Sequence, residues 1–468
     1  MNVSEQASKA LGDGFASIVK QFQLPTGFSL EVLEAAESAA RAKTDFVQSI
    51  DQIRRDATDI PFVTLDPASS TDLDQAFAID ADGDDIVLNY ALADVGAFVP
   101  VGGPVEIEAW QRGVTIYGLA EKVPLYPKVI SQGAASLLPD GPRAAFLVVV
   151  SVGPDGAIKL RSIDRVVCAS RAKLAYNTFN VNSIPHLEEF ANRIWCDETA
   201  RGAIRVEFPQ QEVVVDESAP GGVRLELRAR NYAESVNSTL SLAVNLAIAK
   251  LFIDHRTGLF RVMSEPNEHA LATLRRAAHV LGIDWSRSET LRDLQRRMDP
   301  NNMTHQRFLL EARRAGGRAS YAILEPRKTP WHSAIAASYS HATAPMRRLA
   351  DRYVLDLAFL LANGRSVPSE LTETLNKLPA AMEHGERLAS NVDRTVIDLL
   401  EAVSLQHRIG EILIAEVVDA EAGIVQTADS AIRARATLLT KVANGDKVRV
   451  RIDDADPNKR MVRLTAVD

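Results

Sequence analysis

The amino-acid sequence predicts an α+β protein with a small β-barrel at its C-terminal end. Its 468 residues are 46% apolar, which is enough for a large core spread over two or three domains. Helix patterns fill the first part of the chain, strand patterns follow, and a helical block then precedes a last group of short strands. Strands and helices that occupy separate blocks are typical of α+β proteins.

The first 58 residues predict a helical N-terminal segment. Ser29 is a suitable N-cap, and apolar residues follow it at helical spacing, namely Leu30, Leu33, Ala36 and Ala40. The segment has more acidic than basic residues, so we do not expect a nucleic-acid-binding arm here.

Strand patterns begin after Pro61. Two pairs of β-type runs flank turn sequences, Asp82-Gly83 in the first pair and Pro154-Asp155-Gly156 in the second, and both predict hairpins. The expected strands cover residues 62–65, 76–80, 86–93, 144–152 and 157–167.

The chain beyond Asn231 is mostly helical by pattern. Residues 261–330 carry thirteen Lys and Arg against eight Asp and Glu. Solvated helix faces are the simpler interpretation of this tract, although it also suits a wall that follows phosphates. The expected helices cover residues 234–252, 269–281, 303–315 and 345–361, inside an expected catalytic domain at 59–405.

Short strands return after residue 409 and are separated by turns such as Asn444-Gly445. About 60 residues of short strands predict a small barrel of the oligonucleotide-binding (OB) type over residues 406–468. The expected strands cover residues 412–418, 423–426, 447–452 and 461–466.

Composition narrows the class of protein. Cys168 and Cys196 have no CxxC or Cys/His partner, which favours a reducing compartment and argues against structural zinc. The N-terminus lacks a secretory pattern and no apolar run approaches the ~18 residues of a membrane span. We therefore expect a cytoplasmic enzyme with no membrane partner. A net charge of −8 does not favour nucleic-acid binding through bulk charge.

Three aspartates stand close together between two expected strands: Asp66, Asp72 and Asp74. Crowded carboxylates raise one another's pKa unless a cation lies among them, and oxygen ligands select a hard ion such as Mg²⁺ or Mn²⁺. Metal-assisted phosphoryl transfer suits such a site. A polar turn in which Asp and Ser cap backbone groups explains the spacing equally well.

A second polar segment runs over residues 339–351. A helix that begins at Pro345 would place Arg347 and Arg348 in its first turn, where positive charge opposes the helix dipole. This placement indicates an anionic partner, which Arg binds with a fork of two donors. The alternative is a salt bridge to Asp351 or to another acidic residue.

Together the two segments resemble the signatures of the ribonuclease II/R (RNB) family of exoribonucleases. The first family signature is Asp, five residues, then Asp-x-Asp-Asp, which corresponds here to Asp66, Asp72, Asp74 and Gln75. The second resembles Tyr-x-His-Phe-Thr-Ser-Pro-Ile-Arg-Arg-Tyr and corresponds to residues 339–349, with Ala in place of the Ser.

The resemblance implies a mixed β-sheet or barrel flanked by helices that hydrolyses single-stranded RNA from its 3′ end to nucleoside 5′-monophosphates. It implies Mg²⁺ or Mn²⁺ as the cofactor and no obligate protein partner. The implied catalytic residues are Asp66, Asp72, Asp74 and Arg347, and the implied metal ligands are Asp66, Asp72, Asp74 and Gln75. The implied RNA-binding residues are Tyr176, which would stack on the terminal base, Glu234, His341, Arg347 and Arg348.

The chain departs from the family pattern in three respects. No cold-shock domains are recognisable before residue 59, and the second stacking aromatic has no clear counterpart, since Val206 stands there and Phe208 nearby. Gln75 replaces the fourth aspartate, so one negative charge is missing. An RNA-binding or regulatory protein with weak or absent catalysis is therefore the main alternative, and a metal-dependent phosphohydrolase of small substrates is a more distant one.

Overall fold

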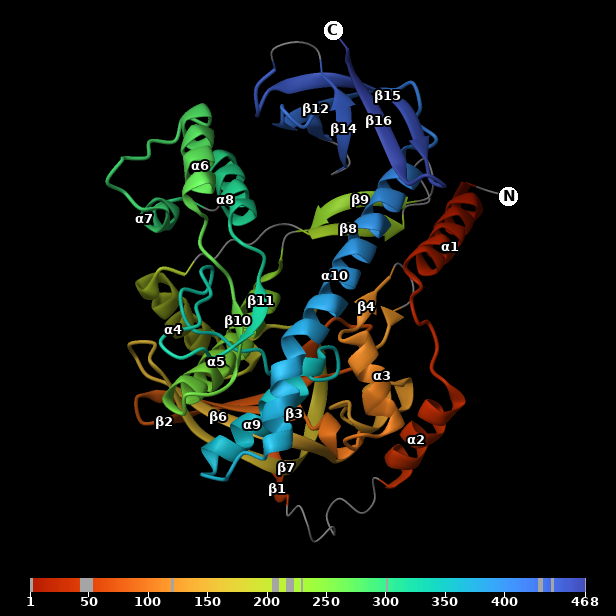
Figure 1. The fold of residues 1–468 in the computed structure, drawn as a ribbon. Coiled ribbons are helices and arrows are strands. Elements are labelled where there is room, and N and C mark those ends of the chain that lie inside the picture. The colour runs from red at the N-terminus through yellow and green to blue at the C-terminus, as the bar shows by residue number, and fades with distance from the viewer. Residues whose placement is uncertain are drawn as a thin grey trace.

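The computed structural model describes residues 3–42, 54–118, 122–203, 210–215, 223–228, 230–299, 302–427, 432–438 and 442–467. Within these residues two closed five-stranded barrels lie at opposite ends of the molecule. The long helix α10 (Ser369–Leu405) runs from the region of the first barrel to the second (Figure 1). The fold is α+β, as predicted.

The first barrel contains both predicted hairpins. The β2–β3 and β6–β7 pairs are antiparallel, and their turns contain Gly83 and Gly156 at φ of 61° and 81°. Parallel pairing of β1 with β7 closes the barrel. In barrel order the strands are β1 (Arg55–Asp66), β2 (Gln75–Asp82), β3 (Asp85–Ala93), β6 (Arg143–Val152) and β7 (Ile158–Ala175).

The start of β1 corrects one prediction. Residues 55–58, expected at the end of the helical segment, are strand. The reason is tertiary, because Arg55 pairs with Val166 of β7, which lies far away in the sequence. The hydrogen bonds of that pairing are not visible in a local pattern.

The N-terminal helices α1 (Val3–Phe22) and α2 (Leu30–Arg41) pack against the body of the molecule. Ser29 caps α2 as predicted, since its Oγ accepts the Val32 N–H at 3.3 Å. Pro25 and Gly27 lie in the segment between these two helices. Their carbonyls accept hydrogen bonds of 2.8 and 2.5 Å from Arg112, at the end of α3 (Pro104–Arg112). These bonds hold the helical segment against the domain that carries the site.

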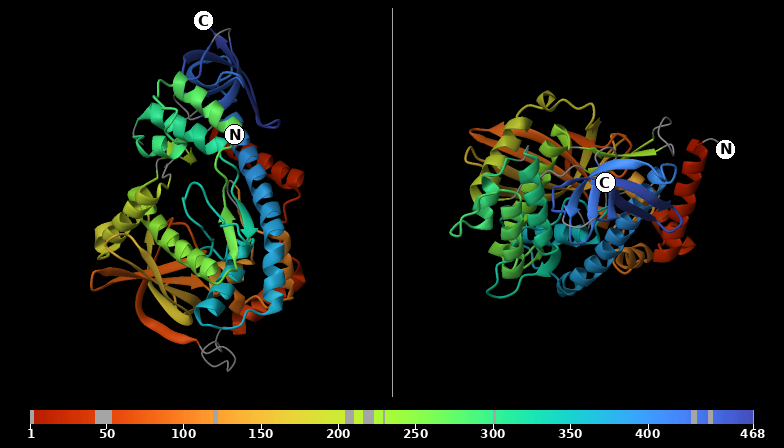
Figure 2. Two further views of the ribbon diagram at one scale, coloured as in Figure 1. Left: turned by 60° about the vertical axis from the view of Figure 1, so that its left-hand side comes forward. Right: turned by 90° about the horizontal axis from the view of Figure 1, so that it is seen from above.

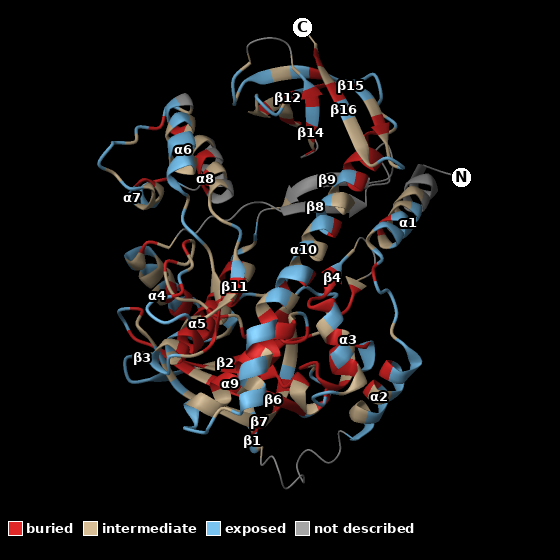
Figure 3. Ribbon diagram, in the orientation of Figure 1, coloured by how far each residue is buried: buried red, intermediate tan, exposed pale blue. Residues whose placement is uncertain are grey.

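Helix α5 (Tyr232–Asp254) crosses the core and is buried on almost every side. Among the described helices it is the one long and apolar enough to cross a membrane by composition, and 61% of its apolar window is buried inside the fold. An all-round apolar helix is what a buried core position requires. Figure 3 shows the buried residues concentrated around α5, α9 (Leu349–Ala362) and the first barrel.

Helices α6 (Glu268–Val280), α7 (Leu291–Arg296) and α8 (Met303–Ala315) form a separate lobe with its own small core around Phe308. The two-stranded sheet of β10 (Leu259–Val262) and β11 (Ser320–Ile323) connects it to the body, as the turned view shows (Figure 2). The lobe holds most of the basic tract. Arg292 and Arg297 pair there with Glu265 and Glu289, which fits the interpretation as solvated helix faces.

The C-terminal barrel has the predicted OB-type architecture, and of its described strands only β14 was not predicted. Its order is β12 (Ile412–Asp419), β13 (Ile424–Thr427), β14 (Arg433–Thr437), β16 (Met461–Val467) and β15 (Lys447–Asp456). Helix α10 contains Pro379 in its interior and was not among the predicted helices. The remaining elements are β4 (Ile116–Tyr117), β5 (Lys122–Val123), α4 (Leu187–Arg201), β8 (Gln210–Val215) and β9 (Val223–Arg228).

Candidate active site

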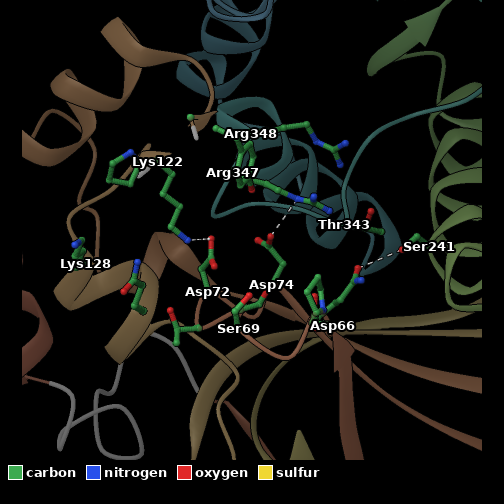
Figure 4. Close-up of a pocket in the computed structure, with 18 of the residues that line it drawn as sticks. Asp66, Ser69, Asp72, Asp74, Lys122, Lys128, Ser241, Thr343, Arg347 and Arg348 are labelled. Carbon is green, nitrogen blue, oxygen red and sulfur yellow. Dashed lines mark hydrogen bonds and ion pairs between the residues drawn. The ribbon is translucent and has the colours of Figure 1, made fainter. Parts of the chain in front are cut away.

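A pocket of about 1390 Å³ lies between the first barrel, α5 and the turn before α9 (Figure 4). The fold brings to it residues from the end of β1, the loop before β2, the end of β7, α5 and the turn before α9. Eight of the nine predicted site residues line it: Asp66, Asp72, Asp74, Gln75, Tyr176, Glu234, Arg347 and Arg348.

The backbone of the acidic loop, residues 66–74, is held in place by hydrogen bonds from side chains outside the loop. Ser136 Oγ accepts the Leu73 N–H at 2.9 Å and donates to the Thr71 carbonyl at 2.7 Å. Lys173 Nζ donates to a carbonyl of the same loop at 2.7 Å. The carboxylates therefore project from a backbone whose course is set by side-chain hydrogen bonds from buried Ser136 and partly buried Lys173.

The positive charges near Asp66 and Asp74 do not fully offset the cost of burying the two carboxylates. Asp74 accepts the Met346 N–H at 2.7 Å and lies 3.4 Å from Arg347 Nε, yet burial raises its pKa to about 7. Burial, and then the charge of Asp74, raise the pKa of Asp66 to about 7. Asp66 Oδ2 is buried and has no hydrogen-bond partner among the described residues. An added cation would relieve both groups.

Asp72 and Gln75 have partners of their own. Lys122 Nζ lies 2.6 Å from Asp72 Oδ2. Gln75 Oε1 accepts hydrogen bonds from Tyr90 at 2.6 Å and from Ser241 at 3.2 Å. The oxygen that Gln75 would offer a metal is therefore already used twice.

A divalent cation fits only part of the predicted ligand set. Among the described residues, no three His, Cys, Asp or Glu side chains converge closely enough to hold a metal ion. The unpartnered Asp66 oxygen beside buried Asp74 does suit a hard cation, since both groups offer oxygen and carry unneutralised charge. Metal binding by Asp66, Asp72, Asp74 and Gln75 stays a prediction.

The two adjacent arginines have different surroundings. Helix α9 begins at Leu349 with Arg348 as its N-cap, so the predicted placement of both arginines in a first helical turn is wrong. The cause is that Arg348 is extended, at φ −134° and ψ 121°, and forms a β-bridge with Val114, while the Thr115 N–H donates to the Arg347 carbonyl at 3.0 Å. The Arg347 side chain is 48% exposed at the pocket.

Arg348 forms the salt bridge that the sequence offered as an alternative. Its Nη2 lies 2.6 Å from Asp351 Oδ2, and the Asp351 side chain is fully buried. Asp351 also accepts the Ala344 N–H at 2.8 Å. Arg348 thus supports the turn before α9, and its contact with RNA stays a prediction.

His341 does not line the pocket. Its Nδ1 lies 2.8 Å from the hydroxyl of Tyr321, and its ring packs edge-on against Tyr339. Burial, followed by the charge of Arg348, lowers the pKa of His341 well below its usual range, so the ring is neutral at pH 7. A neutral imidazole ring that lies outside the pocket does not supply the positive charge expected of a phosphate-binding residue.

Helix α5 carries a stripe of polar residues, of which only Glu234 was predicted as a site residue. Glu234, Asn237, Ser241 and Asn245 recur every three or four residues and line the pocket. Asn237 Nδ2 donates to the Tyr176 hydroxyl at 2.8 Å and so orients that ring. The available signal was this period of polar residues in an otherwise apolar helix.

Glu234 has a structural role that the sequence did not reveal. It completes a capping box with Asn231 at the start of α5. Its two carboxylate oxygens accept from Arg228 at 2.9 and 3.0 Å, and these bonds lower its pKa, so it is ionised at neutral pH. Val206 and Phe208 lie outside the described residues.

The raised pKa values predict how pH affects the metal-free protein. Between about pH 4 and 7, folded Asp66 and Asp74, with pKa about 7, hold protons that unfolded aspartates with pKa 3.8 release. The folded state binds more protons, so this contribution to stability is lost as pH rises through that interval. In EDTA, the melting temperature of Asp66→Asn relative to the wild type should rise by at least ~2 °C from pH 5 to pH 8. A constant difference would contradict this assignment.

Comparison with known proteins shows which family the chain belongs to. The sequence matches the RNB domain over residues 54–359 and the RNase II-type exonuclease C-terminal S1 domain over residues 413–467. The chain belongs to the RNB family. It is 27% identical to ribonuclease R of Aquifex aeolicus over 428 residues, which cover 84% of this chain and 58% of that protein. The chain thus spans little more than half the length of that relative.

Solved structures of other proteins share the fold, among them the following two. RNase R of Mycoplasma genitalium in complex with ribose methylated single-stranded RNA matches with a TM-score of 0.85 and 20% identity, over 97% of this chain and 77% of that chain. Yeast Ssd1, described as a pseudonuclease, matches with a TM-score of 0.62 and 16% identity, over 85% of this chain and 52% of that chain. At these identities the likeness concerns the fold alone.

Proposed function

We propose that this chain is a hydrolytic, metal-dependent exoribonuclease that degrades single-stranded RNA from its 3′ end to nucleoside 5′-monophosphates. One observation carries the proposal: Asp66, Asp72, Asp74, Arg347 and Tyr176 line a single pocket although they come from distant parts of the chain. Carboxylates, an exposed guanidinium and an aromatic ring are the groups that a metal, a phosphate and a base require.

The pocket offers a chemical group suited to each contact of the proposed reaction. Tyr176, held by Asn237, offers a ring to the terminal base, and stacking of this kind is independent of base identity. Arg347 offers its exposed guanidinium to the scissile phosphate. Attack of water on the phosphorus breaks the bond to the 3′ oxygen of the preceding nucleotide, which takes up a proton, and the phosphate stays on the 5′ oxygen of the released nucleotide. A divalent cation bound by Asp66 and Asp74 would activate the water and stabilise the leaving oxygen.

The test uses a short single-stranded RNA labelled at its 5′ end and incubated with the protein and Mg²⁺. A ladder that recedes from the 3′ end, with 5′-monophosphates as the released product, supports the proposal. DNA of the same sequence is the matched substrate, because a protein distinguishes RNA from DNA through the 2′-hydroxyl. An intact RNA under all metal conditions contradicts it.

The second candidate is an RNA-binding protein on the same scaffold with weak or absent catalysis. The specific observation in its favour is Gln75, whose oxygen accepts from Tyr90 and Ser241 and which brings no negative charge to the site. RNA binding without a ladder would select this function. Absence of both would leave hydrolysis of small phosphate esters.

Replacement of Tyr176 tests the base-binding side of the pocket. Tyr176→Ala should leave long RNA degradable but should stop degradation at a longer remnant, because stacking contributes ~1–3 kcal/mol per base and matters most when few nucleotides remain. Tyr176→Phe keeps the ring, loses the bond from Asn237, and should give a remnant close to that of the wild type. Sizing the end products on a gel decides the question. Equal remnants for all three proteins would make Tyr176 a packing residue.

A further inference from the structure

The β4–β5 hairpin brings a lysine to the acidic loop. Its register pairs Tyr117 with Lys122, and both side chains line the pocket. The hairpin is hydrogen-bonded to the turn that carries Arg347, since the Thr115 N–H just before β4 donates to the Arg347 carbonyl at 3.0 Å. Lys122 and Arg347 therefore reach the carboxylates from one hydrogen-bonded unit.

Lys122 acts on one carboxylate and Arg347 on another. Figure 4 shows Lys122 directed to Asp72 and Arg347 directed to Asp74. The Lys122–Asp72 pair is close, at 2.6 Å, and its side chains are only 22% and 17% exposed. Charges shielded to this degree are screened less by salt than surface pairs are. Of the three loop aspartates, Asp66 is the one whose buried oxygen has no hydrogen-bond partner among the described residues.

The charges of the site limit what else it can hold. When all three loop aspartates Asp66, Asp72 and Asp74 are ionised, they and their two cationic neighbours Lys122 and Arg347 carry one net negative charge, and Gln75 adds none. One divalent cation and one RNA phosphate would bring this group of five charges to neutrality. A second divalent cation would leave two uncompensated positive charges in a partly buried pocket, which is costly.

We propose that Lys122 is a built-in counter-charge that limits the site to one divalent cation, held beside Asp66 and Asp74, where other phosphoryl-transfer sites hold two. The inference rests on the proposed function, because it concerns the cation of that reaction. Lys122 is a positioning residue in this scheme. It keeps Asp72 neutralised and directed away from the cation.

The test is a titration of the RNA-free protein with Mn²⁺, with bound ion counted by electron paramagnetic resonance. The wild type and Lys122→Arg, which keeps the charge, should bind one Mn²⁺ per chain. Lys122→Met should bind a second ion, or the first about tenfold more tightly, because the repulsive charge is gone. Lys128→Met removes an exposed lysine of the same pocket that makes no ion pair with the loop among the described residues, and should behave as the wild type.

Two results would overturn the inference: two ions of similar affinity on the wild type, or Lys122→Met indistinguishable from it. Gln75→Asp provides a second approach if Lys122→Met folds poorly, because it restores one negative charge while Lys122 remains. It should tighten Mn²⁺ binding, and unchanged binding would count against the charge argument. Since the titration contains no RNA, these outcomes are independent of the RNA ladder that tests the proposed function.

Discussion

Asp74→Asn should lower the rate of RNA degradation by at least about 10³-fold while single-stranded RNA still binds. Asparagine retains an oxygen that can accept the Met346 N–H, so the backbone contact at 2.7 Å survives. What is lost is the negative charge that faces Arg347 and that would hold the cation together with Asp66. The measurement is single-turnover degradation of a labelled RNA beside a filter-binding isotherm for the same RNA.

Asp80→Asn is the matched control, because Asp80 is an exposed carboxylate on β2, the strand that follows Asp74, and does not line the pocket. It should change neither quantity. Near-normal turnover of Asp74→Asn would remove the acidic loop from the chemistry. Loss of binding together with turnover would show that Asp74 holds the pocket open rather than taking part in the reaction.

Local patterns were sufficient for the parts of the fold in which neighbours in sequence are neighbours in space. The turns at Gly83 and Gly156, the Ser29 cap and the C-terminal barrel were predicted because turn, cap and alternation signals lie within a few residues. The acidic loop was also found this way, since its three aspartates lie within nine residues of one another.

The features that the sequence did not predict depend on contacts between residues that are far apart in the chain. The start of β1 is set by pairing with Val166, and the start of α9 by the β-bridge between Arg348 and Val114. Lys122 belongs to a stretch of sequence with no recognisable motif. It comes within ion-pair distance of Asp72 only because β4 and β5 pair next to the acidic loop. No local sequence pattern predicts that Asp72 forms an ion pair with Lys122.

Arg348→Met should destabilise the folded protein by about 3 kcal/mol or more, because it leaves the fully buried Asp351 carboxylate without its ion partner. Asp351 holds the turn before α9 through the Ala344 N–H, so the damage should reach the position of Arg347 as well. Arg347→Met removes the adjacent charge from an exposed position and should lower RNA turnover with a much smaller loss of stability.

Urea unfolding of the single variants Arg347→Met, Arg348→Met and Asp351→Asn and of the double variant Arg348→Met with Asp351→Asn separates these roles. The double variant should recover part of the stability, since a neutral amide no longer requires the buried cation, and the deviation from additivity measures the pair. This result would make Arg348 a support for the turn and Arg347 the phosphate contact, although they stand side by side in the sequence. If Arg348→Met instead unfolds like the wild type and binds RNA weakly, the original expectation that both arginines contact RNA is correct, and the Asp351 bridge is incidental to the site.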